Sequence, residues 1–228
     1  MVKKYKSHSD DYETFVLVTG QHKEMLYQAL DLFKITPDKD LEIMSHNQSL
    51  SDLTVKIIEG VAEVIEEFHP HLLFVQGDTT STFAASLAAF YNKVPIAHVE
   101  AGLRTGNIYS PFPEEANRRL TGIATTFHFP PTRKSAENLL NEGYKRSNIF
   151  VTGNTVIDSL LEISNDLEST ELNDAYENLF DKKFDIKFNK NIKTLLVTGH
   201  RRESFGEGFL NICHALKEIS ETDGIQII

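Results

Sequence analysis

Three carboxylates follow apolar stretches of the chain, at positions where acid–base chemistry is expected. Asp78 and Glu100 each come directly after a short apolar run, and Glu114 lies in a Pro-flanked turn. Carboxylates gathered in a partly closed cleft raise one another's pKa, which prepares one of them to act near neutral pH. For Asp78 and Glu114 a structural role at a helix start is an equal alternative. Glu100 is harder to explain structurally, because an unpaired buried acid is costly.

A second group of candidates is cationic. His200 begins the segment HRRES, which two glycines follow closely. A His, two Arg and a Gly-rich turn before a helix suit a pyrophosphate or a sugar phosphate, but the spacing is neither a P-loop nor a Rossmann fingerprint. A solvated basic turn is the alternative. Arg104, Arg118 and Arg119 are either further anion ligands or ion-pair partners of the two adjacent glutamates at 114–115.

Alternating apolar strands and amphipathic helices must position these residues. The patterns predict an α/β fold with a parallel sheet covered on both faces. Residues 35–48 are expected to be irregular, and 166–192 are expected to form a connector. His98, inside a buried strand, is interpreted as a core histidine. Strands are predicted at 14–19, 72–76, 94–99, 127–129, 149–152, 194–198 and 225–228, and helices at 22–34, 50–68, 79–92, 113–125, 132–142, 154–165 and 207–220.

One short pattern recurs four times where a predicted strand ends and a helix begins. Each copy has a strand end, a glycine and then a polar residue. In an open α/β sheet this edge is where ligands bind, and helix N-termini there favour phosphates. An ordinary turn explains any single copy, but four copies with four different polar residues favour a ligand site. The copies are Val18-Thr19-Gly20-Gln21, Val75-Gln76-Gly77-Asp78, Val151-Thr152-Gly153-Asn154 and Val197-Thr198-Gly199-His200.

Composition excludes several classes of protein. The formal net charge of −10 argues against a nucleic-acid partner, which needs a basic stripe, but allows a small anionic ligand. The single cysteine, Cys213, excludes an internal disulfide and a Cys-based zinc site and fits a cytoplasmic location. No apolar run approaches about 18 residues, so no membrane span is predicted. The basic stretch at 1–15 has no apolar segment behind it and is no secretory signal.

The longer motifs resemble those of the bacterial non-hydrolysing UDP-N-acetylglucosamine 2-epimerases. They are GDTTSTFAASLAAFY, PIAHVEAGLRTGNIYSPFPEEANRRLTG, VTGNTVID and VTGHRRESFGEG, and with VTGQHKEML they cover nearly the whole chain. The YSPFPEE loop and GDTTST favour this branch over its relatives. The resemblance implies a glycosyltransferase-B-like fold of two Rossmann-like domains. The expected boundaries are an N-terminal domain at 1–165, lacking its first strand, and at 166–228 a connector with the start of the second domain.

The resemblance also implies an activity and roles for residues. The family interconverts UDP-GlcNAc and UDP-ManNAc by removing the C2 proton and eliminating UDP, through 2-acetamidoglucal, without a metal or other cofactor. A homodimer is implied, and the pathway that it feeds is cell-wall polysaccharide biosynthesis or, as an alternative, capsule synthesis. The motifs assign acid–base chemistry to Asp78, Glu100 and Glu114 with His200, substrate binding to Asp78, Glu100, Arg118 and His200, and a second, allosteric UDP-GlcNAc site to Gln21 and Arg201.

Two family segments have no counterpart here. Family members begin with a strand and a GTRPE-type loop, and they continue beyond position 228 with a PVHxNP segment and a Ser-Gly-Gly turn. The expectation is a truncated or split epimerase with little or no activity alone. A UDP-sugar glycosyltransferase and a non-catalytic UDP-sugar-binding fragment are the alternatives. Because a transferase needs one base, three clustered carboxylates favour the epimerase.

Overall fold

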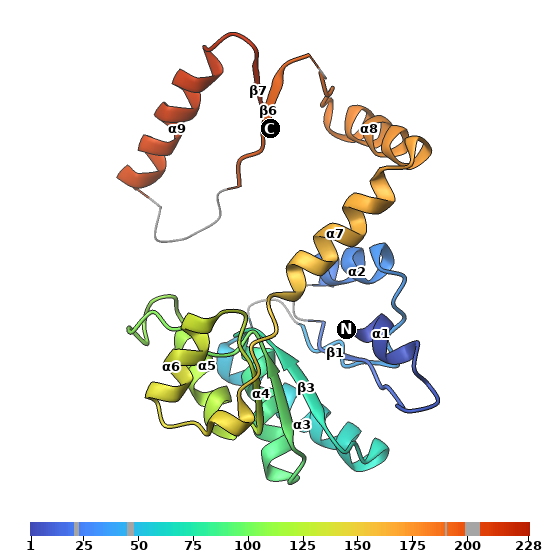
Figure 1. Cartoon of the computed structure of the whole chain (residues 1–228), viewed down its shortest axis with the longest axis vertical. Helices are drawn as coiled ribbons and strands as arrows, with labels where there is room; N and C mark the ends of the chain where they lie inside the picture. The colour runs from blue at the N-terminus through green and yellow to red at the C-terminus, as the bar shows by residue number, and fades with distance from the viewer. Residues whose placement is uncertain (21–22, 45–47, 190, 199–205) are drawn as a thin grey trace. The chain divides into compact units, whose positions relative to one another are not determined.

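The computed structural model of the chain describes residues 1–20, 23–44, 48–189, 191–198 and 206–228. These residues form two compact units, Met1–Asp158 and Ser159–Ile228, and the boundary falls within one helix (Figure 1). No helix in the described ranges is long and apolar enough to cross a membrane.

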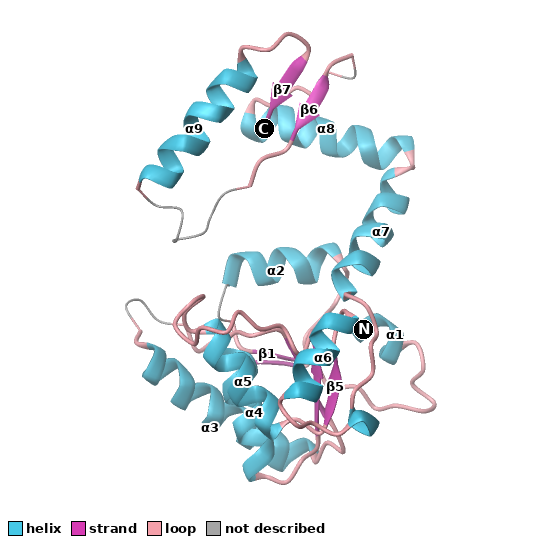
Figure 2. Ribbon diagram, turned by 60° about the vertical axis from the view of Figure 1, so that its left-hand side comes forward, coloured by secondary structure: helices cyan, strands magenta, loops and turns pink. Residues whose placement is uncertain are grey.

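A parallel sheet of three strands is the framework of the first unit. Its strands are β3 (Leu73–Gln76), β4 (Ile96–Val99) and β5 (Phe127–Phe129), in the order β3-β4-β5. Both neighbouring pairs are parallel, so the prediction of parallel strands joined by helices is confirmed (Figure 2). Since parallel strands end at the same edge, the residues after β3 and β4 lie close together.

Two predictions at the margins of this sheet were wrong. Residues 149–152 form no strand of their own: Ile149 makes a single bridge to His128. Within 35–48, expected to be irregular, Lys39–Asp40 (β2) pairs in parallel with Leu17–Val18 (β1). β2 is two polar residues long, too short to show an apolar alternation.

Three helices pack beside one another and carry the core of the first unit. α3 (Leu50–Phe68) contacts α4 (Thr80–Tyr91), and α4 contacts α5 (Glu114–Ala124) as well as β3 and β4. Large apolar side chains of α3 meet the alanine-rich face of α4, whose small residues allow close approach. The buried core is formed by Leu53, Ile57, Val61, Ile65, Val75, Ala84, Ala88, Ala89 and Ile96. The remaining helices of this unit are α1 (Val2–Lys6), α2 (Lys23–Leu32), α6 (Arg133–Asn141) and the 3₁₀ turn η1 (Arg146–Asn148).

The start and end of α3 follow directly from the sequence. The Ser49 hydroxyl accepts a hydrogen bond from the Asp52 amide at 3.1 Å, and the Asp52 carboxylate accepts one from the Ser49 amide at 3.4 Å. This capping box satisfies two amides that the first turn leaves unpaired. At the other end His69 adopts a left-handed conformation (φ 51°) and Pro70 follows, which stops the helix.

The second unit contains a helix where a connector was expected. α7 (Thr155–Leu167) leads into α8 (Thr170–Phe184), a helix that the sequence analysis did not predict, while the role of 166–192 as a connector stays a prediction. The Phe180 ring contacts those of Phe184 and Phe188, at 5.6 and 5.4 Å between centroids. These ring contacts lie on the apolar side of a helix that also carries many charged residues. Beyond it, β6 (Lys193–Leu195) pairs in parallel with β7 (Ile225–Ile227), and α9 (Glu207–Ser220) joins them.

His98 and His128 are register partners on β4 and β5, and each is 1% exposed. The prediction that His98 belongs to the core is confirmed: its Nε2 lies 2.8 Å from the Gly77 carbonyl oxygen. Burial lowers the pKa of His98, and burial together with the neighbouring His98 lowers the pKa of His128 to about 4. Both histidines are therefore neutral inside the folded unit at pH 7.

This pair makes the first unit sensitive to acid. In the unfolded chain His128 titrates near 6.5, so between pH 6.5 and 4 only the unfolded state takes up its proton. Stability is full above pH 6.5 and falls by about 1.4 kcal/mol per pH unit in that window. Urea unfolding should show a loss of about 2 kcal/mol between pH 7 and pH 5 from His128 alone. His128→Phe should reduce the loss and the exposed His71→Gln should not; equal losses in all three proteins would contradict this account.

Candidate active site

The turn after β3 carries Asp78. Gly77 adopts φ +73°, a conformation that glycine reaches without strain, and this turns the chain from the strand into α4. The N-cap of α4 is Thr79, whose hydroxyl accepts a hydrogen bond from the Thr82 amide at 3.3 Å. The alternative that Asp78 caps this helix is therefore wrong, and its carboxylate is available for other contacts.

The turn after β4 brings Glu100 to the same edge. Glu100 itself adopts φ +65°, a left-handed conformation that is uncommon for a residue with a side chain and often marks a functional site. Its amide donates to the Phe129 carbonyl at 3.0 Å, which fixes it at the end of the sheet. A Cβ placed on Gly77 would lie 3.6 Å from Glu100 Oε2, so this carboxylate lies over the turn that carries Asp78.

An arginine from α5 pairs with Asp78 in the turn after β3. The Nε and Nη2 atoms of Arg118 each lie 2.8 Å from Asp78 Oδ2, and Asn117 Nδ2 donates to the Asp78 carbonyl at 3.0 Å. The Arg118 Nη1 donates to Glu115 Oε2 at 3.0 Å. Arg118 is thus held between two carboxylates, the ion-pair alternative of the sequence interpretation. Its role as a substrate ligand stays a prediction.

Glu100 is electrostatically prepared for proton transfer. Burial raises its pKa first, and the neighbouring Asp78 carboxylate raises it further. A hydrogen bond from Asn154 Nδ2 at 3.5 Å and the charge of Arg118 act in the opposite direction. Two acids that share a site but differ in environment are the arrangement in which one can hold a proton while the other is ionised.

The repeated strand-glycine-polar pattern converges on this edge. Gly20, Gly77 and Gly153 all adopt left-handed φ values, of 70°, 73° and 80°. Asn154, the polar residue of the third copy, contacts Glu100 after β4. Thr19 of the first copy lies beside α4, where its hydroxyl is 3.0 Å from that of Ser81. The fourth copy with His200, and the candidates Gln21 and Arg201, lie outside the described residues.

Glu114 is the first residue of α5 and Glu115 is the second. Both acids therefore lie in the first turn, where the helix dipole favours negative charge. Among the described residues the Oε2 atom of Glu114 is buried without a hydrogen-bond partner. A buried acceptor with no partner carries a desolvation penalty that a bound proton donor could remove. The described residues contain no group of three or more His, Cys, Asp or Glu side chains placed to hold a metal ion.

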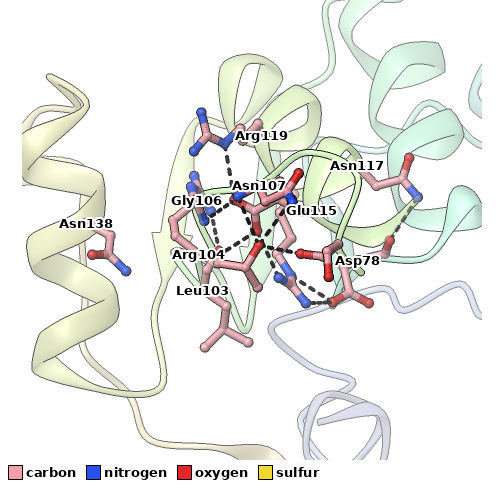
Figure 3. Close-up of polar contacts among 12 residues, drawn as sticks. Asp78, Leu103, Arg104, Gly106, Asn107, Glu115, Asn117, Arg119 and Asn138 are labelled. Atoms are coloured by element: carbon pink, nitrogen blue, oxygen red, sulfur yellow. Dashed lines mark hydrogen bonds and ion pairs between the residues drawn. The ribbon is translucent and has the colours of Figure 1, made fainter. Parts of the chain in front are cut away.

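Glu115 was expected to be a first-turn acid and an ion-pair partner, but the full burial of its side chain was not predicted. Burial alone would raise its pKa, but hydrogen bonds from the Thr105 amide, Arg119 and Arg118 lower it below the usual range. Figure 3 shows this carboxylate surrounded by its donors, beside Asp78. The predicted pairing of Arg118 and Arg119 with Glu115 is confirmed, and residues three and four apart lie side by side on a helix.

Arg104 pairs with Glu142, and not with the glutamates at 114–115 that the sequence analysis named. Its Nε and Nη2 atoms donate to the two carboxylate oxygens of Glu142, at 2.7 and 2.8 Å. This bidentate pair joins the loop after β4 to the end of α6. The alternative in which Arg104 pairs with the acids at 114–115 was therefore wrong, and its role as an anion ligand stays a prediction.

Known proteins are similar to this chain in sequence and in fold. The family model for UDP-N-acetylglucosamine 2-epimerase matches residues 4–228. A Yersinia pestis UDP-N-acetylglucosamine 2-epimerase is 53% identical over 211 residues, covering 92% of this chain and 55% of that protein. The Escherichia coli K12 protein of the same name is 52% identical over 223 residues, covering 95% and 57%. The chain thus spans a little over half the length of these relatives.

Solved structures of proteins with the same or a related name match the fold of this chain. The Neisseria meningitidis UDP-GlcNAc 2-epimerase bound to UDP-GlcNAc matches with a TM-score of 0.88 at 44% identity, over 100% of this chain and 61% of that one. The S. aureus MnaA–UDP co-structure matches with a TM-score of 0.83 at 42% identity, over 99% and 56%. The α/β, glycosyltransferase-B-like fold class is confirmed by these neighbours. The chain belongs to the UDP-N-acetylglucosamine 2-epimerase family.

Proposed function

We propose that this chain supplies the proton-transfer carboxylates of a UDP-N-acetylglucosamine 2-epimerase, an isomerase that interconverts UDP-GlcNAc and UDP-ManNAc. The observation that carries the proposal is the carboxylate pair at the sheet edge. Asp78 is bound to Arg118 at 2.8 Å, and the adjacent Glu100 has a raised pKa. Inverting C2 requires a proton to leave one face of the sugar and another to arrive on the opposite face, which takes acid and base groups on both sides.

The reaction uses these groups in two halves. A carboxylate takes the C2 proton, the electron pair of that bond forms the C1–C2 double bond, and the C1–oxygen bond to UDP breaks. UDP and 2-acetamidoglucal remain in the site. A protonated carboxyl then returns a proton to the other face of C2 while UDP adds again at C1. Asp78, Glu100 and Glu114 are the acids and bases of this scheme.

The leaving group needs positive charge or hydrogen-bond donors, because negative charge develops on the UDP oxygen. We assign this role to His200, with Arg118 contributing on the Asp78 side. Gln21 and Arg201 are the proposed ligands of a second, regulatory UDP-GlcNAc. The homodimer is part of the same proposal. Support for the ligands comes from two solved relatives, because the Neisseria meningitidis structure contains UDP-GlcNAc and the S. aureus MnaA structure contains UDP.

The test is conversion of UDP-GlcNAc to UDP-ManNAc, followed by proton NMR. It is made on this chain and on a chimera in which the chain replaces the matching segment of the Escherichia coli K12 relative. The chimera is expected to convert each sugar nucleotide into the other and to reach the same ratio from both sides. The same chimera with Asp78→Asn is expected to lose about 10³-fold in rate. A folded chimera that binds UDP and converts neither sugar would refute the proposal.

A further inference from the structure

Glu115 is a fully buried carboxylate whose neighbour in sequence, Glu114, is a proposed acid–base group. A buried charge is tolerated only when it is well paired and hydrogen-bonded. Glu115 lies in the first turn of α5, the helix that also carries Asn117 and Arg118. A charged group in this place calls for an explanation beyond helix capping.

Both oxygens of Glu115 are fully occupied. Oε2 accepts from the Thr105 amide at 3.1 Å and from Arg118 Nη1 at 3.0 Å. Oε1 accepts from the Gly106 amide at 3.4 Å and from Arg119 Nε at 3.2 Å. With four donors on two oxygens, the carboxylate has no direction left for a substrate or a proton. Its role in any chemistry is therefore exerted through the groups it holds.

Arg118 is the most important of these groups. A guanidinium is planar and presents its donors in fixed directions. With Nη1 committed to Glu115, the opposite edge, Nε and Nη2, faces Asp78 Oδ2 at 2.8 Å from each nitrogen. The ion pair therefore uses one oxygen of Asp78, and its orientation is set from the Glu115 side.

The loop before α5 is the second group that Glu115 holds. Its two amide contacts, to Thr105 and Gly106, join this loop to the helix start. Inside the loop the Thr105 hydroxyl donates to the Ser110 carbonyl at 2.6 Å. The loop and the first turn of α5 are thereby fixed to each other at the place where Glu114 begins the helix.

We propose that Glu115 is a positioning residue of the active site: by fixing Arg118 and the 103–110 loop together, it holds Asp78, Glu100 and Glu114 in their working arrangement. The inference deepens the proposed function and rests on it for the meaning of that arrangement. Glu115 itself touches no substrate. If Glu115 is replaced, Arg118 loses one of its two anchors and turns away from Asp78, while the fold is otherwise preserved.

The test is a carboxyl carbon-13 NMR titration of the full chain, in the wild type and in Glu115→Gln. The charge of Arg118 lowers the pKa of Glu100, so an Arg118 that has turned away should raise the Glu100 midpoint. Simple removal of the negative charge at position 115 would act in the opposite direction. A raised midpoint in a variant with an unchanged amide fingerprint supports the proposal. An unchanged or lowered midpoint in such a variant overturns it.

A matched control separates positioning from general disruption. Glu67→Gln breaks another carboxylate–cation pair of the same unit, with Lys39 at 3.2 Å, outside the 103–110 loop and outside α5. This variant should leave the Glu100 midpoint unchanged. If Glu115→Gln does not fold, Glu115→Asp keeps the charge but is one methylene too short to hold both the loop and Arg118, and the same rise is expected. No rise in a folded Glu115→Asp then overturns the proposal.

Turnover gives a second readout in the chimera. Glu115→Gln is expected to lower kcat by about 10²-fold with KM changed much less, because misplaced groups slow the chemical step more than binding. Glu67→Gln should leave kcat within about twofold of the unsubstituted chimera. Failure of the proposed function would appear as a chimera without conversion, whatever residue is at 115. Failure of the positioning role would appear as an unchanged Glu100 midpoint and an unchanged kcat in a chimera that does convert, so the two are distinguishable.

Discussion

Replacing Glu100 by glutamine is expected to lower the rate of epimerisation by about 10³-fold while leaving the fold as stable as before, or more stable. General acid–base groups contribute factors of about 10²–10⁴, and glutamine keeps the shape of the side chain without its proton chemistry. The pKa of Glu100 is raised by burial and by Asp78, so its ionised form is disfavoured in the folded state at neutral pH. Neutralising it removes that penalty. The measurement is kcat for the chimera, together with the urea midpoint of the chain.

Glu137→Gln is the control for this substitution. Glu137 lies on α6, and its side chain is 62% exposed in a surface pair with Lys134. Exposed pairs of this kind contribute little to stability, so this variant should match the unsubstituted protein in both rate and midpoint. If Glu100→Gln retained most of the rate, or lowered the urea midpoint by as much as a core substitution, Glu100 would be a structural residue.

The largest effect on stability is expected from Gly102→Ala. Gly102 adopts φ +82°, and a Cβ there would lie 2.3 Å from the Ser135 carbonyl oxygen and 2.9 Å from its carbonyl carbon. The obstacle is backbone of α6, which cannot rotate away as a side chain would. Left-handed strain and forced displacement together should lower the free energy of unfolding by about 3–5 kcal/mol. Urea unfolding of the variant measures this loss.

Gly106→Ala isolates the conformational part of that effect. Gly106 has nearly the same φ, +83°, but nothing lies within 4 Å of a Cβ placed there. We expect a loss of about 1 kcal/mol, from the left-handed conformation alone. If both variants lost the same free energy of unfolding, the clash with α6 at Gly102 would contribute nothing. The account of Gly102 would then be wrong.

The helices and their ends could be predicted where residues close in sequence determine them. Ser49 and Pro70 mark the ends of α3 because a cap and a helix breaker act within one turn. The α8 segment was missed although its apolar residues recur at helical steps, because many charged and amide residues lie between them. The apolar residues are Leu172, Tyr176, Leu179, Phe180 and Phe184, a spacing that predicts a helix.

In the site, too, residues placed by local sequence were predicted and contacts between distant segments were not. Asp78 and Glu100 were found because each follows an apolar strand, and parallel strands bring such residues to one edge. The burial of Glu115 was not predicted, because it depends on a loop that folds back to offer two backbone amides. Arg104 was given the wrong partner for a similar reason: Glu142 is 38 positions away, and only the packing of α6 brings it near. Sequence spacing alone cannot reveal contacts made through tertiary structure.

The measurement that tests the central claim most directly is the fate of the C2 hydrogen during epimerisation. UDP-GlcNAc is incubated with the chimera in deuterium oxide, and the sugar nucleotides are examined by NMR and mass spectrometry. If the carboxylates at the sheet edge transfer protons to and from C2, the UDP-ManNAc formed will carry deuterium at C2, and Glu100→Gln will slow its appearance together with the conversion. Conversion with the original C2 hydrogen retained would contradict the account.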